Sequence, residues 1–384
     1  MNFQPLKDFL DYYLPMLGVP GSDTVIYRNH EEIFRYSSGF DNIHLRTPVR
    51  QDAIYNIYSC TKPIIAVCAT QLIEKGELLP TDPLYAYIPE FKDVERNVFD
   101  ESGKVVGTEK VKKPILIQHL LTMTSGMNYN LNVPEIEDVV EKTDGLAPTL
   151  DVCRALAKVP LDFEPGENYK YSLSYDVLGG VIEVITGMKL CDYVKENIFV
   201  PLGMKDSGFH INESNSQRFA TMYDYDGKQG VPKMIPFTQN KFRFGKEYDS
   251  AGAGIVSTVN DYILFADALA MGGVGKTGER IISKYGIDLI RANALSEAQI
   301  KGYTSYFPHC KGYGYGYGVR CCVNPYPYGV VAPLGEFGWD GAKLCYTSMS
   351  PETGISMFHA EHMGGFHSIV VPRLRNLLYS CIGE

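Results

Sequence analysis

The chain has 384 residues, of which 45% are hydrophobic and 21% are charged, and its formal net charge is −9. This length exceeds the usual size of one hydrophobic core, so two domains or one domain with an inserted lobe are expected. The negative charge and the absence of a basic tract argue against a nucleic-acid partner. No apolar run approaches the length of a membrane span, so no membrane partner is expected either.

The cysteines and the first residues indicate a reducing compartment. The nine cysteines are an odd number, scattered along the chain, and several lie within apolar segments. They are expected to be free core residues and not a disulfide framework. Residues 1–10 lack a basic segment followed by an apolar run, so no export signal is predicted. The sequence therefore predicts a cytoplasmic protein.

The first part of the chain predicts a helix, a hairpin, and a strand that leads into a second helix. Apolar residues recur with helical spacing over 3–17. The β-prone runs 24–28 and 32–36 flank a short polar turn, which predicts a hairpin. A further β-prone run, 53–58, passes directly into an apolar helix that is expected to end near Lys75.

The middle of the chain, from about residue 80 to 250, alternates short helical runs with turns rich in proline and glycine. Residues 104–113 are charged and contain glycine, which predicts a hairpin-like surface excursion. Helices are expected over 150–157 and 175–186. The stretch 213–250 has little periodicity and is expected to form loops that line or cover a cleft.

The last third of the chain returns to alternating helix and strand patterns. A helix is expected to begin at Ser257 or Thr258 and to end at the glycine pair 272–273. Three strands and a closing helix follow, over 312–320, 344–349, 355–359 and 368–380.

Strands near both ends of the chain and helices between them predict an α+β fold. Residues 1–79 and 251–384 are expected to build one antiparallel sheet flanked by helices, and to carry Ser59 and Trp339. Residues 80–250 are expected to form an inserted, mainly helical lobe that carries Tyr171.

Ser59 and Lys62 are the first candidate catalytic pair. They lie three residues apart where the strand 53–58 passes into a helix, so both side chains face the same side. The start of a helix also favours negative charge near the serine oxygen. A partly desolvated lysine can accept the proton of a serine hydroxyl and so activate it as a nucleophile. Spacing alone leaves open that this is a chance match.

Two aromatic segments supply further candidates. Tyr171 lies on a turn before a helix, where a nearby ammonium group and the helix start are expected to lower its pKa and allow proton exchange. Trp339, the single tryptophan, is flanked by glycines before a strand, which suits a close approach of the backbone to a ligand. Ordinary packing remains open for both residues.

Two other patterns resemble a phosphate-binding loop and a metal site but do not match the spacing of either. Residues 272–277 resemble a phosphate loop in composition, but Ala270 occupies the place of its first glycine and a helix precedes it. Zinc-ligand spacing is absent from the cluster of His359, Glu361, His362 and His367. No metal and no cofactor are therefore expected.

Three segments taken in chain order resemble the motifs of the serine β-lactamase and penicillin-binding-protein-like superfamily: Ser59-Cys60-Thr61-Lys62, Tyr171-Ser172-Leu173 and Trp339-Asp340-Gly341. The resemblance is closest to the class C β-lactamase-like branch, and within it to the β-lactamase-fold carboxylesterases of family VIII type. It extends over nearly the whole chain.

The resemblance implies a role for each matched residue. Ser59 is similar to the acylated nucleophile, Lys62 to the group that accepts its proton, and Tyr171 to the tyrosine that passes protons to the leaving group. The implied oxyanion hole consists of the backbone N–H groups of Ser59 and Ala342. Leu173, Trp339, Asp340 and Gly341 fall on the implied substrate-binding positions.

Two departures from the family pattern bear on the substrate. The second motif ends in Leu173 where the β-lactamases and DD-peptidases have asparagine. The third begins with Trp339, followed by Asp340, where lysine or histidine usually helps to bind a substrate carboxylate. The loss of that cation does not favour an anionic penicillin or a D-Ala-D-Ala terminus. Lys343 could supply a charge only if its strand directs it toward the site.

The expected function is therefore a serine carboxylesterase that acts through an acyl-enzyme on small, uncharged esters. The first alternative is an amidase or D-amino-acid peptidase, or a weak β-lactamase. The small-molecule substrate would then be an amide. A non-catalytic binding or scaffold protein of the same fold is the second. The sequence does not predict an oligomeric state.

Overall fold

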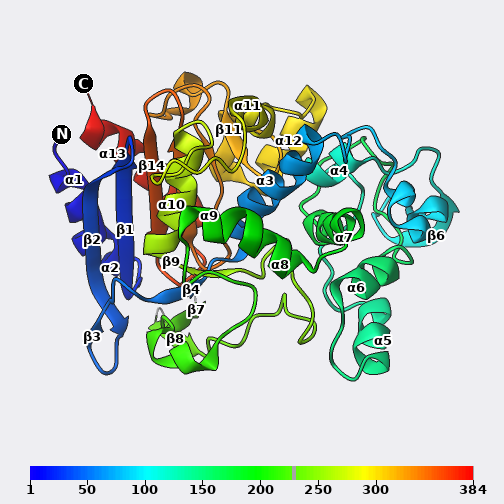
Figure 1. Ribbon diagram of the computed structural model, residues 1–384, viewed down its shortest axis with the longest axis horizontal. Helices are drawn as coiled ribbons and strands as arrows, with labels where there is room; N and C mark the ends of the chain where they lie inside the picture. Colours follow the sequence, from blue (N-terminus) through cyan, green and yellow to red (C-terminus); the bar gives the residue numbers. More distant parts are fainter. Residues whose placement is uncertain (227–230, 384) are drawn as a thin grey trace.

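The computed structural model of the chain describes residues 1–226 and 231–383, and it has the predicted α+β fold (Figure 1). Its largest sheet is antiparallel and has eight strands in the order β10-β11-β12-β13-β14-β1-β2-β3. The strands are Gly21–Arg28 (β1), Glu31–Asn42 (β2), Thr47–Pro48 (β3), Tyr313–Tyr315 (β10), Arg320–Cys322 (β11), Phe337–Gly338 (β12), Cys345–Ser350 (β13) and Ile355–Ala360 (β14). Strands from both ends of the chain therefore pair side by side, β14 next to β1.

Helices from the two ends of the chain cover one face of this sheet. Gln4–Asp8 (α1), the π-helical turn Phe9–Tyr13 and Leu14–Met16 (α2) pack with His367–Ile382 (α13) around one apolar cluster. The two termini meet there, and the Asn2 amide donates to the Cys381 carbonyl at 3.0 Å (Figure 1). On the other face, Val259–Ala270 (α10) packs against β14, β1 and β13.

The second layer continues from α10 into the helical part of the molecule. Thr61–Glu74 (α3) is almost wholly buried and contacts Lys284–Arg291 (α11) and Ser174–Thr186 (α7). The remaining helices are Ile117–Leu121 (α4), Pro134–Lys142 (α5), Thr149–Leu156 (α6), Leu190–Val194 (α8), Val200–Leu202 (α9) and Glu297–Tyr306 (α12). In Figure 1, α4, α5 and α6 lie on the side of α3 away from α10, whereas α9 lies next to α10. A helix buried on all sides in this way can place a polar side chain in a dry environment.

Three small two-stranded sheets complete the fold. Ile54–Asn56 (β4) pairs with Val256–Thr258 (β9), Glu95–Phe99 (β5) with Val105–Lys110 (β6), and Met222–Asp226 (β7) with Val231–Ile235 (β8). The β4–β9 pair brings residues before α3 next to those before α10. The surface hairpin predicted over 104–113 is present but begins earlier, because those residues contain only its second strand, β6.

The predicted elements agree well with the structure where the signal is local. The N-terminal hairpin turns at Asn29 and His30, whose φ angles of 52° and 68° are left-handed, as a tight hairpin turn requires. Thr258 caps α10 by accepting from the Asp261 amide at 3.0 Å. The helix from Ser59 ends at Glu74, as expected from Gly76.

Three expectations about local structure were wrong or incomplete. The single strand predicted over 312–320 is two strands, β10 and β11, because the glycine-rich run between them turns, with Gly318 at a φ of 69°. The expected loops over 213–250 contain a 3₁₀ helix, Glu213–Arg218, and the β7–β8 hairpin. Residues 227–230 of that stretch lie outside the described part. Helices α11 and α12 were not predicted.

All nine cysteines lie in the described part of the chain and are unpaired; eight are buried and Cys191 is half-buried. They are therefore core thiols, as predicted. Among the helices of the described residues, none is long and apolar enough to cross a lipid bilayer.

Candidate active site

Ser59 lies in a tight turn between β4 and α3, on a strained backbone. The preceding Tyr58 has a φ of 46°, a left-handed conformation that bulky residues rarely adopt. Its ring is buried against Met222 and Ala253, and its hydroxyl lies 3.1 Å from the Met222 sulfur. This packing holds the turn in place and leaves the Ser59 side chain on the wall of a pocket.

Lys62 lies one turn further along α3 and is wholly buried. Its Nζ donates to Ser59 Oγ at 3.1 Å and to the Gly252 carbonyl at 2.8 Å. Burial lowers the pKa of Lys62 from 10.5 to about 7, although the nearby Asp176 carboxylate opposes this shift. At neutral pH a large share of Lys62 is therefore an uncharged amine in contact with the serine hydroxyl.

Asp176 is a buried carboxylate that sequence analysis missed. It lies on the inner face of α7, where its Oδ1 accepts hydrogen bonds from Tyr248 Oη at 2.8 Å and Ser250 Oγ at 2.7 Å. Its Oδ2 faces the Gly252 segment so closely that a β-carbon on Gly252 would lie 2.6 Å from it. Burial raises the pKa of Asp176, and the charge of Lys62 lowers it. Asp176 thus holds in place the loop that contains Gly252, whose carbonyl accepts from Lys62. Its negative charge also favours the protonated form of the lysine.

Tyr171 lies beside this pair, as the sequence predicted, but with a different pKa. The Lys62 Nζ is 4.5 Å from the centre of the tyrosine ring, and Trp339 Nε1 donates to Tyr171 Oη at 3.0 Å. The expected lowering of its pKa is wrong: burial raises the pKa well above 10, and hydrogen bonds from Ser59 and Trp339 oppose this only in part. Tyr171 is therefore a neutral phenol at any ordinary pH.

Two backbone amides on the pocket wall are free to bind an oxyanion. Among the described residues, neither Ser59 N–H nor Ala342 N–H has a protein acceptor, and both residues line the pocket. Gly341 allows the two segments to approach each other, because a β-carbon there would lie 2.3 Å from the Ile57 carbonyl oxygen. Its own amide is held by the Cys345 carbonyl at 2.7 Å. The oxyanion hole of Ser59 and Ala342 that the resemblance implies therefore stays a prediction, with both residues on one pocket wall.

The pocket next to these groups has a volume of about 840 Å³ and a largely aromatic wall, with Tyr129, Tyr171, Phe242, Tyr306, Phe307 and Trp339 among its lining residues. Asp340 lies in it between two imidazoles, with His309 Nε2 and His367 Nε2 each 3.8 Å from a carboxylate oxygen. These imidazoles lower the pKa of Asp340 against the effect of burial. Asp340 is therefore an ionised carboxylate, and it faces the His309 imidazole, whose pKa is raised to about 10 by the neighbouring Cys310 and Asp340 against the effect of burial. His309 and His367 were not assigned to the pocket from the sequence.

Comparison with known proteins identifies the family of this chain. The family model described as Beta-lactamase matches residues 6–360. The chain belongs to the beta-lactamase family. Esterase EstB of Burkholderia gladioli is 30% identical over 338 residues, 84% of this chain and 80% of the esterase. The acyltransferase CalJ of Penicillium decumbens is 26% identical over 90% of this chain and 84% of its own length. The solved structure of simvastatin synthase LovD of Aspergillus terreus has a TM-score of 0.80 at 20% identity, covering 98% of this chain and 97% of that one.

Within this beta-lactamase-family fold, not every expected substrate-binding residue reaches the pocket. Trp339, Asp340 and Gly341 line it, but Leu173 does not. Leu173 is buried at the start of α7, where its amide donates to the Asn128 carbonyl. Lys343 contacts Asp224 and donates to the Tyr223 carbonyl at 2.9 Å. Its ammonium group therefore interacts with β7 and not with the pocket.

The histidine cluster near the C-terminus is dispersed over separate contacts. His359 contacts Thr24 Oγ1 at 2.7 Å and Glu361 Oε1 at 3.0 Å. His362 Nδ1 contacts the Ala220 carbonyl at 3.1 Å, and His367 Nε2 contacts the Gly341 carbonyl at 2.8 Å. His367 therefore belongs to the beta-lactamase-family pocket, whereas His359 and His362 belong to the core.

Proposed function

We propose that this beta-lactamase-family chain is a serine hydrolase that forms an acyl-enzyme on Ser59, and that its substrates are small, uncharged carboxylic esters. The observation that supports this most strongly is the contact of 3.1 Å between Ser59 Oγ and the buried amine of Lys62. A lysine whose pKa is about 7 is matched to proton transfer at neutral pH.

In the proposed acylation step, Ser59 Oγ attacks the ester carbonyl while its proton passes to neutral Lys62. The carbonyl oxygen becomes an oxyanion that accepts hydrogen bonds from the amides of Ser59 and Ala342, donors that are typically worth about 3–4 kcal/mol each. The tetrahedral intermediate then collapses, the ester C–O bond breaks, and the alkoxide takes a proton. Water later attacks the acyl-enzyme and returns the enzyme to its starting state.

In the proposed mechanism, Tyr171 delivers the proton to the leaving alkoxide. Trp339 donates to the Tyr171 oxygen, so the phenolic hydrogen is left for another acceptor. Because burial keeps the phenol neutral, Tyr171 acts as a donor that is refilled from protonated Lys62, and not as a phenolate base. Proton donation by a neutral phenol replaces the expectation that Tyr171 has a lowered pKa.

The pocket supports an uncharged substrate. Trp339 occupies the place where the family pattern has a cation that pairs with a substrate carboxylate, and the neighbouring Asp340 already faces the imidazoles of His309 and His367 at 3.8 Å each. The aromatic wall suits an apolar acyl group. An anionic penicillin would bring a charge that the indole and the Asp340 carboxylate do not pair with.

The rate of hydrolysis is expected to rise with pH with a midpoint near 7. Only the neutral form of Lys62 accepts the Ser59 proton, and that form increases as the pH passes the lysine pKa of about 7. The measurement is kcat/KM for p-nitrophenyl butyrate between pH 5 and 9. A profile that is flat across this range would contradict the role of Lys62 as the base.

Replacing Asp176 with asparagine is expected to move that midpoint to lower pH by about one unit. The carboxylate stabilises the charged lysine, so its removal lowers the Lys62 pKa further, while the amide oxygen can still accept from Tyr248 and Ser250. The pH profile of the variant shows the shift directly. Asp192→Asn, a change of charge elsewhere in the helical region, is the control and is expected to leave the midpoint in place. A shift to higher pH would contradict the assignment.

The proposed function is tested with a panel of p-nitrophenyl acetate and butyrate, nitrocefin, and a D-Ala-D-Ala peptide. Ester turnover together with labelling of Ser59 by a fluorophosphonate probe supports the proposal. Nitrocefin turnover or a stable penicilloyl adduct on Ser59 would favour the β-lactamase alternative, and peptide cleavage the peptidase. If the probe fails to label Ser59 and no substrate turns over, the chain is a non-catalytic member of the fold.

Acyl transfer to an alcohol is a second candidate. A volume of about 840 Å³ is large enough for an alcohol beside a small acyl group, and a relative with 26% identity is named an acyltransferase. Adding an alcohol such as butanol to the ester assay distinguishes the two: a transferase forms the butyl ester, whereas a hydrolase forms only the acid.

A further inference from the structure

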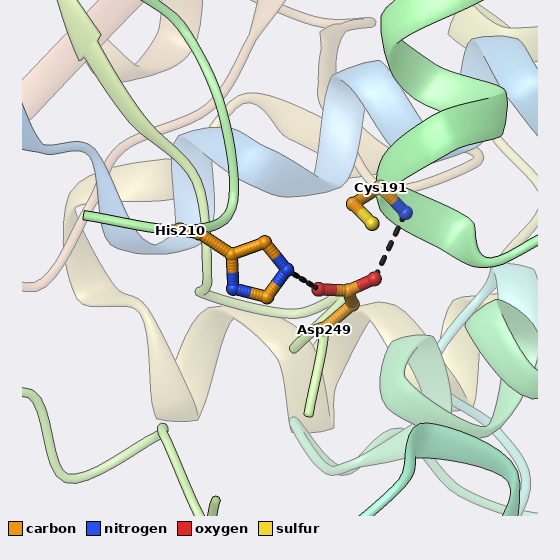
Figure 2. A group of neighbouring side chains, drawn as sticks. All are labelled: Cys191, His210 and Asp249. Carbon is orange, nitrogen blue, oxygen red and sulfur yellow. Dashed lines mark hydrogen bonds and ion pairs between the residues drawn. The ribbon is translucent and has the colours of Figure 1, made fainter. Parts of the chain in front are cut away.

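Three potential metal ligands meet away from the Ser59 pocket. Cys191 is on α8, His210 is in the loop after α9, and Asp249 is in the loop before Gly252, and their side chains converge on one point (Figure 2). Their ligand atoms all lie within 4.8 Å of one another. His210 Nε2 is 3.2 Å from Asp249 Oδ1, and the Cys191 amide donates to Asp249 Oδ2 at 2.9 Å.

From this convergence we propose that Cys191, His210 and Asp249 bind one divalent transition-metal ion, for which Zn²⁺ is the best match. Thiolate, imidazole and carboxylate are the ligands that zinc uses, with bond lengths of about 2.0–2.3 Å, so ligand atoms around a tetrahedral ion lie about 3.5 Å apart. The three ligand atoms lie within 4.8 Å of one another, so they must move closer when the ion binds, and the exposed His210 ring and the half-buried Cys191 thiol are the groups proposed to move. Water occupies the fourth position.

The electrostatic environment favours a cation independently of the ligand types. Asp249 is 2% exposed, and its Oδ1 has no hydrogen-bond donor within the described chain, only the contact with His210. Glu183, which accepts from the Leu190 amide at 2.9 Å, adds a second acidic group that interacts with Asp249. The ammonium of Lys189, which also interacts with Asp249, is exposed and pairs with Glu247 at 3.4 Å. The Arg243 guanidinium also interacts with Asp249, but its hydrogen bonds go to the Phe209 and Gly254 carbonyls, so Asp249 Oδ1 keeps no hydrogen-bond donor among the described residues. A buried carboxylate oxygen without a donor is costly unless a cation completes the site.

A cysteine nucleophile is the competing interpretation of the same three residues. Such a nucleophile needs a base at its sulfur, as in Cys–His pairs. Here the thiol of Cys191 interacts with the Asp249 carboxylate, and histidine is bound to that carboxylate as well. The Cys191 thiol and the His210 imidazole both contact the Asp249 carboxylate, an arrangement that suits a metal ion. Because the imidazole contacts the carboxylate, it does not activate the thiol. On metal binding, the Zn–S bond replaces the S–H bond, and the proton is released to solvent.

The proposed site is connected to the candidate active site by a short piece of backbone. The Asp249 amide donates to Thr149 Oγ1 at 2.9 Å, and the next residue, Ser250, donates to Asp176 at 2.7 Å. Two residues further, the Gly252 carbonyl accepts from Lys62 at 2.8 Å. A metal bound to Asp249 would therefore anchor the segment that positions the lysine. The metal site itself does not depend on the proposed esterase function.

The test uses the full-length protein, freed of metal with a chelator and then titrated with ZnCl₂ or CoCl₂. We expect one equivalent to bind, with release of one proton, a rise of a few degrees in melting temperature, and a thiolate-to-cobalt charge-transfer band in the near ultraviolet. Cys191→Ser is expected to lose the band, and His210→Ala to weaken binding by more than about 100-fold. None of these measurements requires catalytic activity.

Matched controls separate this site from the other thiols and histidines. Cys381→Ser and His44→Ala change residues far along the chain from the cluster and are expected to retain stoichiometry, affinity and band. Cys191 is half-buried and His210 exposed, so both test variants are expected to fold, which circular dichroism checks. The proposal is overturned if the metal-free protein takes up no zinc, or if the Cys191→Ser and His210→Ala variants bind it as the original chain does.

Discussion

Replacing Ser59 with alanine is expected to lower kcat for ester hydrolysis by about 10⁴- to 10⁶-fold. The variant loses the atom that forms the acyl-enzyme, while the amides of Ser59 and Ala342 and the pocket remain. Residual activity would come only from polarisation of the carbonyl toward water. The measurement is the rate of p-nitrophenyl butyrate hydrolysis together with intact-protein mass spectrometry after a short incubation, which detects an acyl adduct on the original chain and none on the variant.

Ser368→Ala is the matched control, because Ser368 is an exposed serine that lines the same pocket and has no proposed role. It is expected to change the rate by no more than about twofold. Since Ser59 is only partly exposed and alanine is smaller, the main variant should fold normally. Activity of Ser59→Ala close to that of the original chain would mean that another residue carries the chemistry.

The parts of the site that sequence analysis predicted are those set by local geometry. Ser59 and Lys62 are three residues apart on one helical turn, so the 3.1 Å contact needs no knowledge of the rest of the fold. Their meeting with Tyr171 and Trp339 was predicted only through a resemblance of ordered motifs, because no local rule joins residues so distant in sequence. The pKa of Tyr171 was misjudged because burial, a tertiary property, outweighs the hydrogen bonds from Ser59 and Trp339.

Some missed features did have a signal in the sequence. Asp176 is an acidic residue within the apolar run of α7, and a charge in such a run is buried only with specific partners. Helix α12 begins with a capping box, Ser296 and Gln299, whose side chains each bond the other's backbone. By contrast, His309 and His367 meet Asp340 through the packing of segments that are far apart in the sequence, which no spacing rule predicts.

The proposed reactivity of Lys62 has a cost in stability. An amine can accept the Ser59 proton at neutral pH only because burial disfavours its charged form. The same burial makes the folded state less favourable than one with an apolar side chain at that position. Function and stability therefore oppose each other at one residue, as is common at active sites. This opposition can be measured.

Replacing Lys62 with methionine is expected to abolish activity while raising the free energy of unfolding at pH 7 by about 1–3 kcal/mol. A pKa lowered from 10.5 to about 7 corresponds to about 5 kcal/mol of burial cost, at about 1.4 kcal/mol per unit. Methionine cannot donate to the Gly252 carbonyl, and the loss of that hydrogen bond lowers the expected gain in stability by about 1–3 kcal/mol. The buried Asp176 carboxylate is less stable without the lysine charge, and this lowers the expected gain in stability further.

The pH dependence of stability separates this explanation from simple repacking. Between pH about 7 and 10.5 the unfolded chain holds the lysine proton and the folded chain does not, so the stability of the original protein rises with pH. Below pH 7 both states are protonated and this contribution is constant. The advantage of the methionine variant should therefore be largest at or below pH 7 and shrink toward pH 10. Urea denaturation across this range measures it, and equal pH slopes for the two proteins would show that Lys62 is not buried as an uncharged base.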